Sequence, residues 1–211
     1  MPGKTIAGWH GLKEIAVLAS GRGSNFQALI DAARAGYFPG TIARLITDNP
    51  DAYAIRRAKD AGIPVSVLDF SSFPDRMTYE VALMGEMEEC DPDLFVLAGY
   101  MRILPRAIVR AFPGRILNIH PALLPSFPGL HAQRQAVEYG VKVSGCTVHF
   151  VDEGTDTGPV IIQRCVPVEE GDDEETLAAR ILVEEHRILA EAVRLVLEGR
   201  AKLVGRRVGI R

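Results

Sequence analysis

The 211-residue chain has few cysteines, no long apolar run and little net charge. Its three cysteines, Cys90, Cys146 and Cys165, lie far apart without a Cys-x-x-Cys pair, which disfavours a disulfide framework or a zinc site and favours reduced thiols in the cytoplasm. No apolar run approaches the roughly 20 residues of a membrane span. A net charge of −3, with both signs mixed along the chain, argues against binding to nucleic acid or to a membrane surface.

What remains is the composition of an ordinary globular protein, with 47% apolar and 24% charged residues. A chain of this length can form one sizeable core. We therefore expect a single domain over residues 14–200, preceded by an extension at residues 1–13 and followed by a tail at residues 201–211. The extension lacks the apolar core of a signal peptide.

Apolar runs of strand length alternate with helical segments up to about residue 120. The run at residues 15–19 is continuously apolar, as in a strand that is covered on both faces. Strands joined by helices of this length predict an α/β fold with a single doubly wound, mostly parallel sheet. The predicted strands are 15–19, 42–46, 65–68, 94–98 and 116–119, and the predicted helices are 26–33, 52–61, 74–89 and 105–111.

Beyond residue 120 the pattern changes. A short helix at residues 133–138 is followed by strands at residues 145–151 and 158–163, whose short connection predicts an antiparallel hairpin added to the sheet. The last helix is predicted to begin near residues 171–175, whose carboxylates suit the positive end of a helix dipole, and to end before Gly199.

A polar pair closes one of the predicted strands, in the segment Asn118-Ile119-His120-Pro121. On an extended backbone Asn118 and His120 project to the same side, and Pro121 disfavours a helix at His120. The carboxyl end of such a strand is the usual position of the ligand crevice. An uncharged donor beside a titratable donor suits a developing oxyanion in acyl transfer. The alternative is a capped turn without a catalytic role.

A glycine-rich loop, Gly-Arg-Gly-Ser-Asn at residues 21–25, separates the first strand from the first helix, where free N–H groups attract anions. It is neither a Walker loop nor a good dinucleotide fingerprint, because Phe26 stands where the third glycine would be. A phosphate monoester is the better ligand. The alternative is a turn in which Ser24 caps the helix and Gln27 completes a capping box.

Asp156 lies in a glycine-flanked connection at residues 153–158. A carboxylate beside His120 would raise the pKa of the imidazole and make it a better general acid near neutral pH. The alternative is a surface Asx-turn, because nothing in the sequence by itself brings Asp156 to His120.

Three further polar residues each have two interpretations. Glu185 falls within the apolar stripe of the last helix, so it needs either an internal partner or a ligand that donates hydrogen bonds. His149 lies on an alternating strand and is predicted to be a core histidine rather than a group beside the site. Arg102 follows the strand at residues 94–98, where it either binds an acidic ligand or caps the next turn.

Together these motifs resemble the phosphoribosylglycinamide formyltransferases, the folate-dependent enzymes of purine synthesis. The resemblance extends from residue 15 to about residue 197 and implies the Rossmann-like formyltransferase fold. It rests on the segments 21–25, 97–104, 118–125, 128–131, 148–151, 156–159 and 184–186.

The resemblance implies roles for individual residues. The catalytic trio would be Asn118, His120 and Asp156. The residues implied for glycinamide ribonucleotide are Gly23, Ser24 and Asn25 for its phosphate, Glu185 for its ribose hydroxyls, and Gly99 and Pro121 along its path. The residues implied for the folate are Arg76 for its acidic tail and Met101, Arg102, Ile103, Leu104 and Asn118 around its pterin.

The reaction that the resemblance implies is formyl transfer from 10-formyltetrahydrofolate, as co-substrate, to the amine of glycinamide ribonucleotide, without a metal. The implied protein is a cytoplasmic monomer or homodimer that acts on small molecules. Two positions depart from the family pattern: Arg22 stands where asparagine is familiar, and Leu182 stands where some relatives have a polar contact. The alternatives are a formyltetrahydrofolate deformylase and a non-catalytic sensor of folate or nucleotide.

Overall fold

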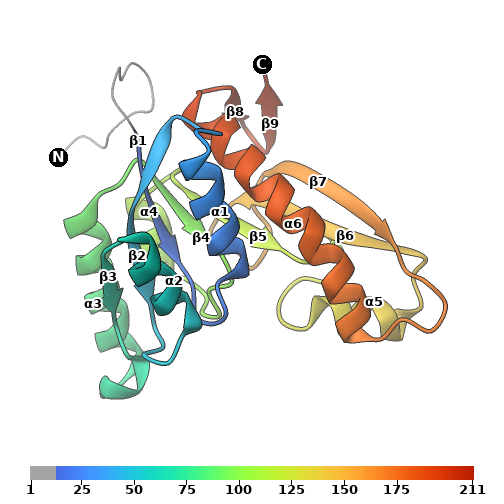
Figure 1. Ribbon diagram of the computed structural model, residues 1–211, viewed down its shortest axis with the longest axis horizontal. Helices are drawn as coiled ribbons and strands as arrows, with labels where there is room; N and C mark the ends of the chain where they lie inside the picture. The colour runs from blue at the N-terminus through green and yellow to red at the C-terminus, as the bar shows by residue number, and fades with distance from the viewer. Residues whose placement is uncertain (1–12) are drawn as a thin grey trace.

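Seven strands form one sheet in the computed structural model, which describes residues 13–211 (Figure 1). The strand order is β3-β2-β1-β4-β5-β6-β7, with β1 to β5 parallel and β6 and β7 antiparallel to their neighbours. This order confirms the doubly wound, mostly parallel sheet with an added hairpin. The strands are β1 (Lys13–Leu18), β2 (Gly40–Thr47), β3 (Val65–Val67), β4 (Leu94–Leu97), β5 (Ile116–His120), β6 (Val143–Phe150) and β7 (Val160–Pro167).

Helices cover both faces of the sheet, so each central strand contributes to two cores. In β4, Leu94 and Val96 belong to one apolar cluster and Phe95 and Leu97 to the other, which explains why the strand is apolar throughout. The helices are α1 (Ser24–Arg34), α2 (Tyr53–Ala61), the 3-10 turn η1 (Phe70–Ser72), α3 (Arg76–Cys90), α4 (Arg106–Ala111), α5 (Ala132–Tyr139) and α6 (Glu174–Leu197).

The long helix α6 lies across α1, β6 and β7, and α5 packs beside it (Figure 1). Its start is fixed by a capping box: the Asp173 carboxylate accepts the Thr176 N–H at 2.8 Å, and the Thr176 hydroxyl accepts the Asp173 N–H at 3.0 Å. Glu174 and Glu175 occupy its first turn, as the acidic run predicted.

The parallel neighbours β1 and β4 mark the point where the order of successive strands across the sheet reverses. From β1 the chain continues to β2 on one side, whereas from β4 it continues to β5 on the other. Ligands of open α/β sheets bind at such a switch point, outside the carboxyl ends of the strands. Here the two strand ends are joined by hydrogen bonds from Ser20 N to the Gly99 carbonyl at 3.0 Å and from Met101 N to Ser20 Oγ at 2.9 Å.

Two boundaries differ from those predicted. The first strand begins at Lys13, inside the range assigned to the extension, whose other residues, 1–12, lie outside the described part of the chain. The segment treated as a tail forms a two-stranded antiparallel hairpin, β8 (Ala201–Val204) and β9 (Arg207–Ile210), which lies against β7. The hairpin contains few apolar residues and most of them are exposed, so the sequence pattern did not predict its strands.

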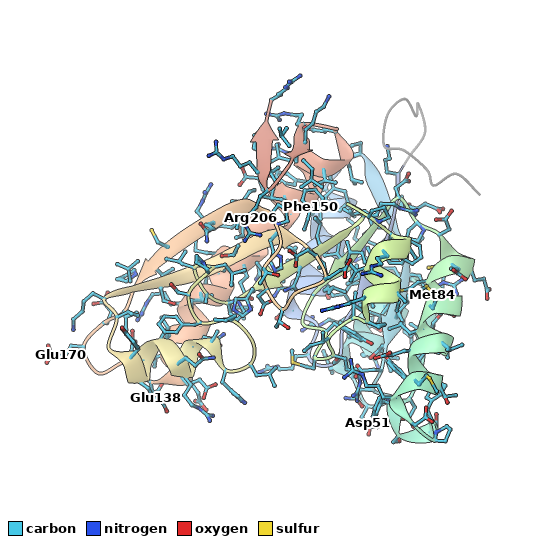
Figure 2. All side chains as sticks on the ribbon, turned by 180° about the vertical axis from the view of Figure 1, so that it is seen from behind. Asp51, Met84, Glu138, Phe150, Glu170 and Arg206 are labelled. Atoms are coloured by element: carbon cyan, nitrogen blue, oxygen red, sulfur yellow. The ribbon has the colours of Figure 1, made fainter. Side chains whose placement is uncertain are left out.

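Seen from behind, the molecule carries this hairpin at one end and α3 along one side (Figure 2). Arg206 marks the turn of the hairpin, and Met84 lies on α3, where it packs against the core that contains Met87. In the described residues no helix combines the length and the apolar character that crossing a membrane requires.

Candidate active site

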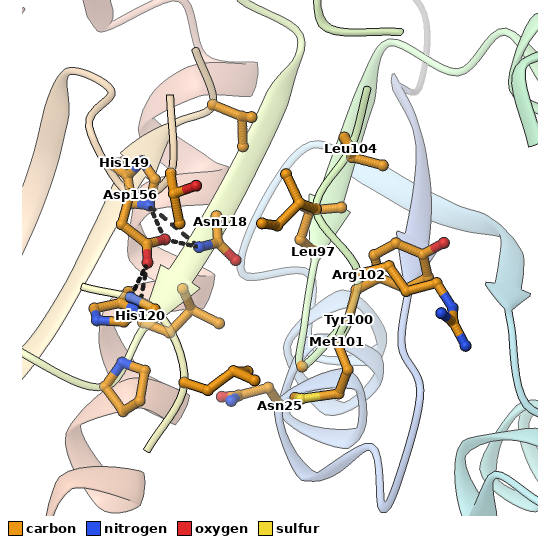
Figure 3. Close-up of a pocket in the computed structure, with 18 of the residues that line it drawn as sticks. Asn25, Leu97, Tyr100, Met101, Arg102, Leu104, Asn118, His120, His149 and Asp156 are labelled. Atoms are coloured by element: carbon orange, nitrogen blue, oxygen red, sulfur yellow. Dashed lines mark hydrogen bonds and ion pairs between the residues drawn. The ribbon is translucent and has the colours of Figure 1, made fainter. Parts of the chain in front are cut away.

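A cavity of about 470 Å³ opens at the carboxyl ends of β1, β4 and β5 (Figure 3). Eleven of the fourteen residues predicted for the site line it, whereas Gly23, Ser24 and Arg76 do not. The predicted residues that line it are Asn25, Gly99, Met101, Arg102, Ile103, Leu104, Asn118, His120, Pro121, Asp156 and Glu185.

The three residues predicted to be catalytic meet at one end of this cavity (Figure 3). Asp156 Oδ2 lies 3.4 Å from His120 Nδ1, and Asp156 Oδ1 accepts a hydrogen bond from Asn118 Nδ2 at 3.3 Å. The Gly129 N–H also donates to Asp156 Oδ2, at 2.8 Å. Asp156 is therefore not a surface turn residue but the centre of a polar cluster.

The path of the backbone explains this convergence. His120 is the last residue of β5, and the next strand, β6, returns antiparallel beside it. The connection after β6 then brings Asp156 back over β5, with Asp156 itself at a left-handed φ of 54°. The loop approaches so closely that a side chain at Gly158 would overlap the Phe150 carbonyl, which only glycine avoids.

The protonation of His120 follows from its two neighbours. Its Nε2 lies 2.8 Å from the Phe127 carbonyl, which can only accept, so Nε2 carries a hydrogen and Nδ1, beside Asp156, is the nitrogen that titrates. Burial lowers the pKa of His120 more than Asp156 raises it, and the net pKa lies below the ordinary value. The predicted increase in this pKa is therefore wrong for the protein without substrate, although the effect of the carboxylate has the predicted sign.

Asp156 behaves in the opposite way. Its burial alone would raise the pKa of the carboxyl group. His149, whose Nε2 lies 3.7 Å from Oδ1, the hydrogen bond from the Gly129 N–H and attraction to His120 together outweigh that effect and lower the pKa. Asp156 is consequently an anion at neutral pH, held next to the titrating nitrogen of His120.

His149 belongs to the site, contrary to the core role predicted for it. It pairs directly with Asn118 across β5 and β6, and its Nε2 lies 3.2 Å from Asn118 Nδ2 and 3.7 Å from Asp156 Oδ1. Its Nδ1 lies 2.9 Å from the Phe150 carbonyl, so it donates there and Nε2 accepts from Asn118 when the ring is neutral. The pairing register of β5 with β6 brings these two side chains together, and the local pattern of either strand does not specify that register.

Asn25 and Glu185 form the opposite end of the cavity. The Glu185 side chain is buried, and its Oε2 accepts a hydrogen bond from Asn25 Nδ2 at 2.8 Å. Burial raises the pKa of Glu185, against the smaller opposing effect of the Asn25 bond. In the described part of the chain Asn25 Oδ1 has no hydrogen-bond partner although it is buried. A pair with such unmet capacity is suited to a ligand that carries hydroxyl groups.

Ser24 does not cap α1, so its side chain does not occupy the N–H groups at the start of this helix. The N-cap is Gly23, in a left-handed conformation and without a side-chain cap, and the first intrahelical bond runs from Gln27 N to the Gly23 carbonyl at 2.9 Å. The capping-box alternative is therefore wrong. The N–H groups at the start of α1 remain available at the positive end of the helix dipole, as an anion site requires.

We expect Gly23→Ala to destabilise the protein, because residue 23 has a φ of +66° and its new Cβ would lie 2.8 Å from Ala54 Cβ. A left-handed non-glycine residue costs about 1–3 kcal/mol, which corresponds to a fall in Tm of roughly 2–12 °C for a chain of this size. Gly21→Ala is the matched control, since its Cβ would meet no atom within 4 Å. Equal Tm values of the two variants in thermal unfolding would contradict this reading of the loop.

The residues predicted for the folate separate into three groups. Met101 and Ile103 are 61% and 62% exposed and face the cavity, and Leu104 is buried beneath them. The guanidinium of Arg102 is directed away from the catalytic trio, toward Asp48 (Figure 3). Arg76 begins α3 outside the cavity lining, exposed and paired with Glu80 at 2.5 Å.

Among residues 13–211 no group of three or more histidine, cysteine or acidic side chains is arranged to hold a metal ion. The chemistry that these side chains themselves offer is hydrogen-bond donation and proton transfer at one end of the cavity, with a polar pair suited to a hydroxylated ligand at the other end.

Comparison with known proteins agrees with this geometry. A family described as formyl transferase matches residues 13–193. The phosphoribosylglycinamide formyltransferase of Escherichia coli K12 is 45% identical over 189 residues, which cover 90% of this chain and 89% of that protein. A trifunctional purine biosynthetic protein of Drosophila pseudoobscura is 47% identical over 194 residues, 91% of this chain, but the match spans only 14% of its own length.

A solved structure is also similar. The glycinamide ribonucleotide transformylase 1 of Symbiobacterium toebii superimposes with a TM-score of 0.92 and 50% identity, over 100% of this chain and 99% of that one. The family match includes all seven strands of the sheet together with Asn118, His120 and Asp156, and the two bacterial relatives each match at least nine tenths of this chain. This chain therefore belongs to the formyl transferase family.

Proposed function

We propose that this chain transfers a formyl group from 10-formyltetrahydrofolate to the amine of glycinamide ribonucleotide, a step of purine biosynthesis in the cytoplasm. The observation that carries the proposal is the meeting of Asn118, His120 and Asp156 at one end of a cavity whose other end holds Asn25 and Glu185. The names of the similar proteins support it. We assign the activity to the domain at residues 14–200.

The ribonucleotide suits the end of the cavity formed by α1 and α6. Its phosphate would accept hydrogen bonds from the N–H groups of Ser24 and Asn25 at the start of α1. Its ribose hydroxyls would donate to Glu185, whose carboxylate accepts a hydrogen bond from Asn25, and to Asn25 Oδ1, which has no hydrogen-bond partner within residues 13–211. Arg22 adds positive charge to this loop, which suits the phosphate.

The folate suits the apolar side of the cavity. Met101 and Ile103 present exposed apolar surface, which a flat ring system would cover, and Asn118 lies at the far end of that wall. Arg76, at the exposed start of α3, is the basic residue we assign to the acidic tail of the folate. The cavity volume of about 470 Å³ lies within the range of small-molecule sites.

In the proposed reaction the amine attacks the formyl carbon directly, and negative charge develops on the formyl oxygen. Once protonated, His120 would donate a hydrogen bond to that oxygen from Nδ1, because its Nε2 hydrogen is bonded to the Phe127 carbonyl, and the growing charge favours this protonated form. Asn118 would donate as well. Its bond to Asp156 is long, at 3.3 Å, so this amide hydrogen is the one we expect to turn toward the formyl oxygen.

The attacking amine must lose a proton and the departing folate nitrogen must gain one. Asp156 is an anion beside His120 Nδ1, so the pair can accept the proton from the amine, directly or through water, and return it to the leaving nitrogen. No covalent bond to the protein is needed, because the nucleophile is the substrate itself. Holding both substrates in line supplies a further part of the rate enhancement.

We expect the purified protein to consume 10-formyltetrahydrofolate only when glycinamide ribonucleotide is present. The absorbance change of the folate measures consumption, and mass spectrometry of the ribonucleotide measures the added formyl group. The control is glycinamide riboside, which lacks the phosphate and should react much more slowly at the same concentration because the α1 loop is not used.

Other outcomes would identify the rival functions. Equal consumption without any amine would indicate a deformylase. Binding of both ligands without turnover would indicate a sensor, and would leave the arrangement of His120 and Asp156 without a catalytic use. Equal rates for the ribonucleotide and the riboside would contradict the phosphate site at Ser24 and Asn25.

A further inference from the structure

Residues 99–104, which we call the wall segment, form the apolar side of the cavity and are held from behind by charged and aromatic side chains. Figure 3 shows Tyr100 and Arg102 directed away from the catalytic trio, whereas Met101 points toward Asn25. Met101 and Ile103 are 61% and 62% exposed, so packing within the cavity does not fix them. The position of Met101 and Ile103 therefore depends on the residues that pack against the other side of the wall segment.

Asp48 is the centre of that support. It follows β2, is only 6% exposed, and its Oδ2 accepts a hydrogen bond from Arg102 Nε at 2.6 Å. A buried carboxylate needs such a partner, since an unpaired charge in the interior is costly. The Asp48 carbonyl also accepts the Phe70 N–H at 3.2 Å. One residue thus binds both the wall segment and the turn η1.

Aromatic rings close the cluster. The Phe70 ring lies under the guanidinium of Arg102, with 3.4 Å between the guanidinium carbon and the ring centroid. Tyr79 packs edge to face against Phe70 at 5.1 Å, and its hydroxyl hydrogen-bonds to the Tyr100 hydroxyl. Burial raises the pKa of both phenols, so this hydrogen bond is unaffected by titration near neutral pH.

We propose that Asp48 and Phe70 are positioning residues which, through Arg102, fix the place of Met101 and Ile103 and thereby the affinity for the ring system of the formyl donor. They touch neither the reacting atoms nor the ribonucleotide pocket. Their effect is to order the wall segment before the ligand binds, so that binding does not have to supply that ordering. The inference rests on the proposed function, because it concerns the donor of that reaction.

The test is Asp48→Asn, which removes the charge and keeps the size of the side chain. We expect KM for 10-formyltetrahydrofolate to rise about tenfold while KM for glycinamide ribonucleotide changes less than about twofold. The matched control is Glu86→Gln, which removes a similar ion pair, Glu86 to Arg44 at 2.6 Å, away from the cavity. The control should lower Tm but leave the ratio of the folate KM to the ribonucleotide KM unchanged.

A double-mutant cycle tests whether Asp48 acts through Arg102. Asp48→Asn, Arg102→Gln and the double variant should raise the folate KM by about the same factor, because either change breaks the same link. If Asp48→Asn does not fold, Phe70→Leu carries the same expectation for the folate KM. Unchanged folate KM, equal increases in both KM values, or multiplying effects in the double variant would each overturn the proposal.

Amide hydrogen exchange without ligands separates this inference from the proposed function. In Asp48→Asn we expect protection of the Met101 amide, which donates to Ser20 Oγ, to fall at least about tenfold, with no change in Glu86→Gln. If the wild-type protein transferred no formyl group, the proposed function would be wrong. The exchange measurement would still decide whether Asp48 orders the wall segment. Unchanged exchange at Met101 would overturn the positioning role.

Discussion

His120→Ala is expected to reduce kcat about a hundred- to ten-thousandfold, with little change in KM for glycinamide ribonucleotide. The variant loses the donor to the formyl oxygen and leaves Asp156 without the imidazole that shares the transferred proton, whereas the ribonucleotide contacts at Asn25 and Glu185 lie at the other end of the cavity. Steady-state rates with each substrate varied in turn give both parameters. A large rise in KM with kcat intact would make His120 a binding residue.

Loss of structure has to be separated from loss of chemistry in that variant, because His120 is only 4% exposed and its Nε2 hydrogen-bonds to the Phe127 carbonyl. Thermal unfolding of the same preparation measures this. His186→Ala is a suitable control, since His186 is a partly buried histidine of α6 that does not line the cavity. We expect it to keep most of the wild-type kcat.

The strands could be predicted from the sequence because local pattern decides them. A strand covered on both faces is apolar along its buried length, and β4 and residues 15–18 of β1 are continuous apolar runs that no surface helix would carry. The shared orientation of Asn118 and His120 could be predicted equally well, because residues that lie two positions apart on a strand project from the same face. Hairpin β8–β9 was missed since its strands are short and mostly exposed, and its pairing depends on contact with β7.

The complete site could not be read from local pattern. Asp156 reaches His120 only because β6 returns antiparallel and the following loop bends at a left-handed residue, and neither feature is encoded at Asp156 alone. The assignment of Asp156 to the site came from the resemblance to the family. His149 was interpreted as core for the same reason, since its partner Asn118 is set by register.

The direction of the His120 pKa shift shows a further limit. The sequence indicated a charged neighbour, which raises the pKa, but not the extent of burial, which lowers it more. Burial depends on every element packed around a side chain. Ser24 is a second example: its sequence context is that of a cap, yet the helix begins at Ser24 and left-handed Gly23 occupies the N-cap position without a side-chain cap.

Asp156→Asn is expected to lower kcat about a hundredfold or more and to lower the pKa of His120 further. The carboxylate lies 3.4 Å from His120 Nδ1 and favours its protonated form, so without it more acid is needed to charge the ring. Titration of the His120 ring by NMR should therefore move to lower pH, and the fall of kcat with rising pH should begin at lower pH than in the wild type.

The matched control for this change is Glu153→Gln, which removes a carboxylate from the same loop where it pairs with Arg110 at 2.8 Å on the surface. We expect it to leave both kcat and the His120 titration unaltered, because Glu153 faces solvent and does not line the cavity. If Asp156→Asn lowered kcat without moving the His120 titration, the carboxylate would act on the proton directly and not through the imidazole. If it changed neither quantity, the convergence of these two side chains would have no part in catalysis.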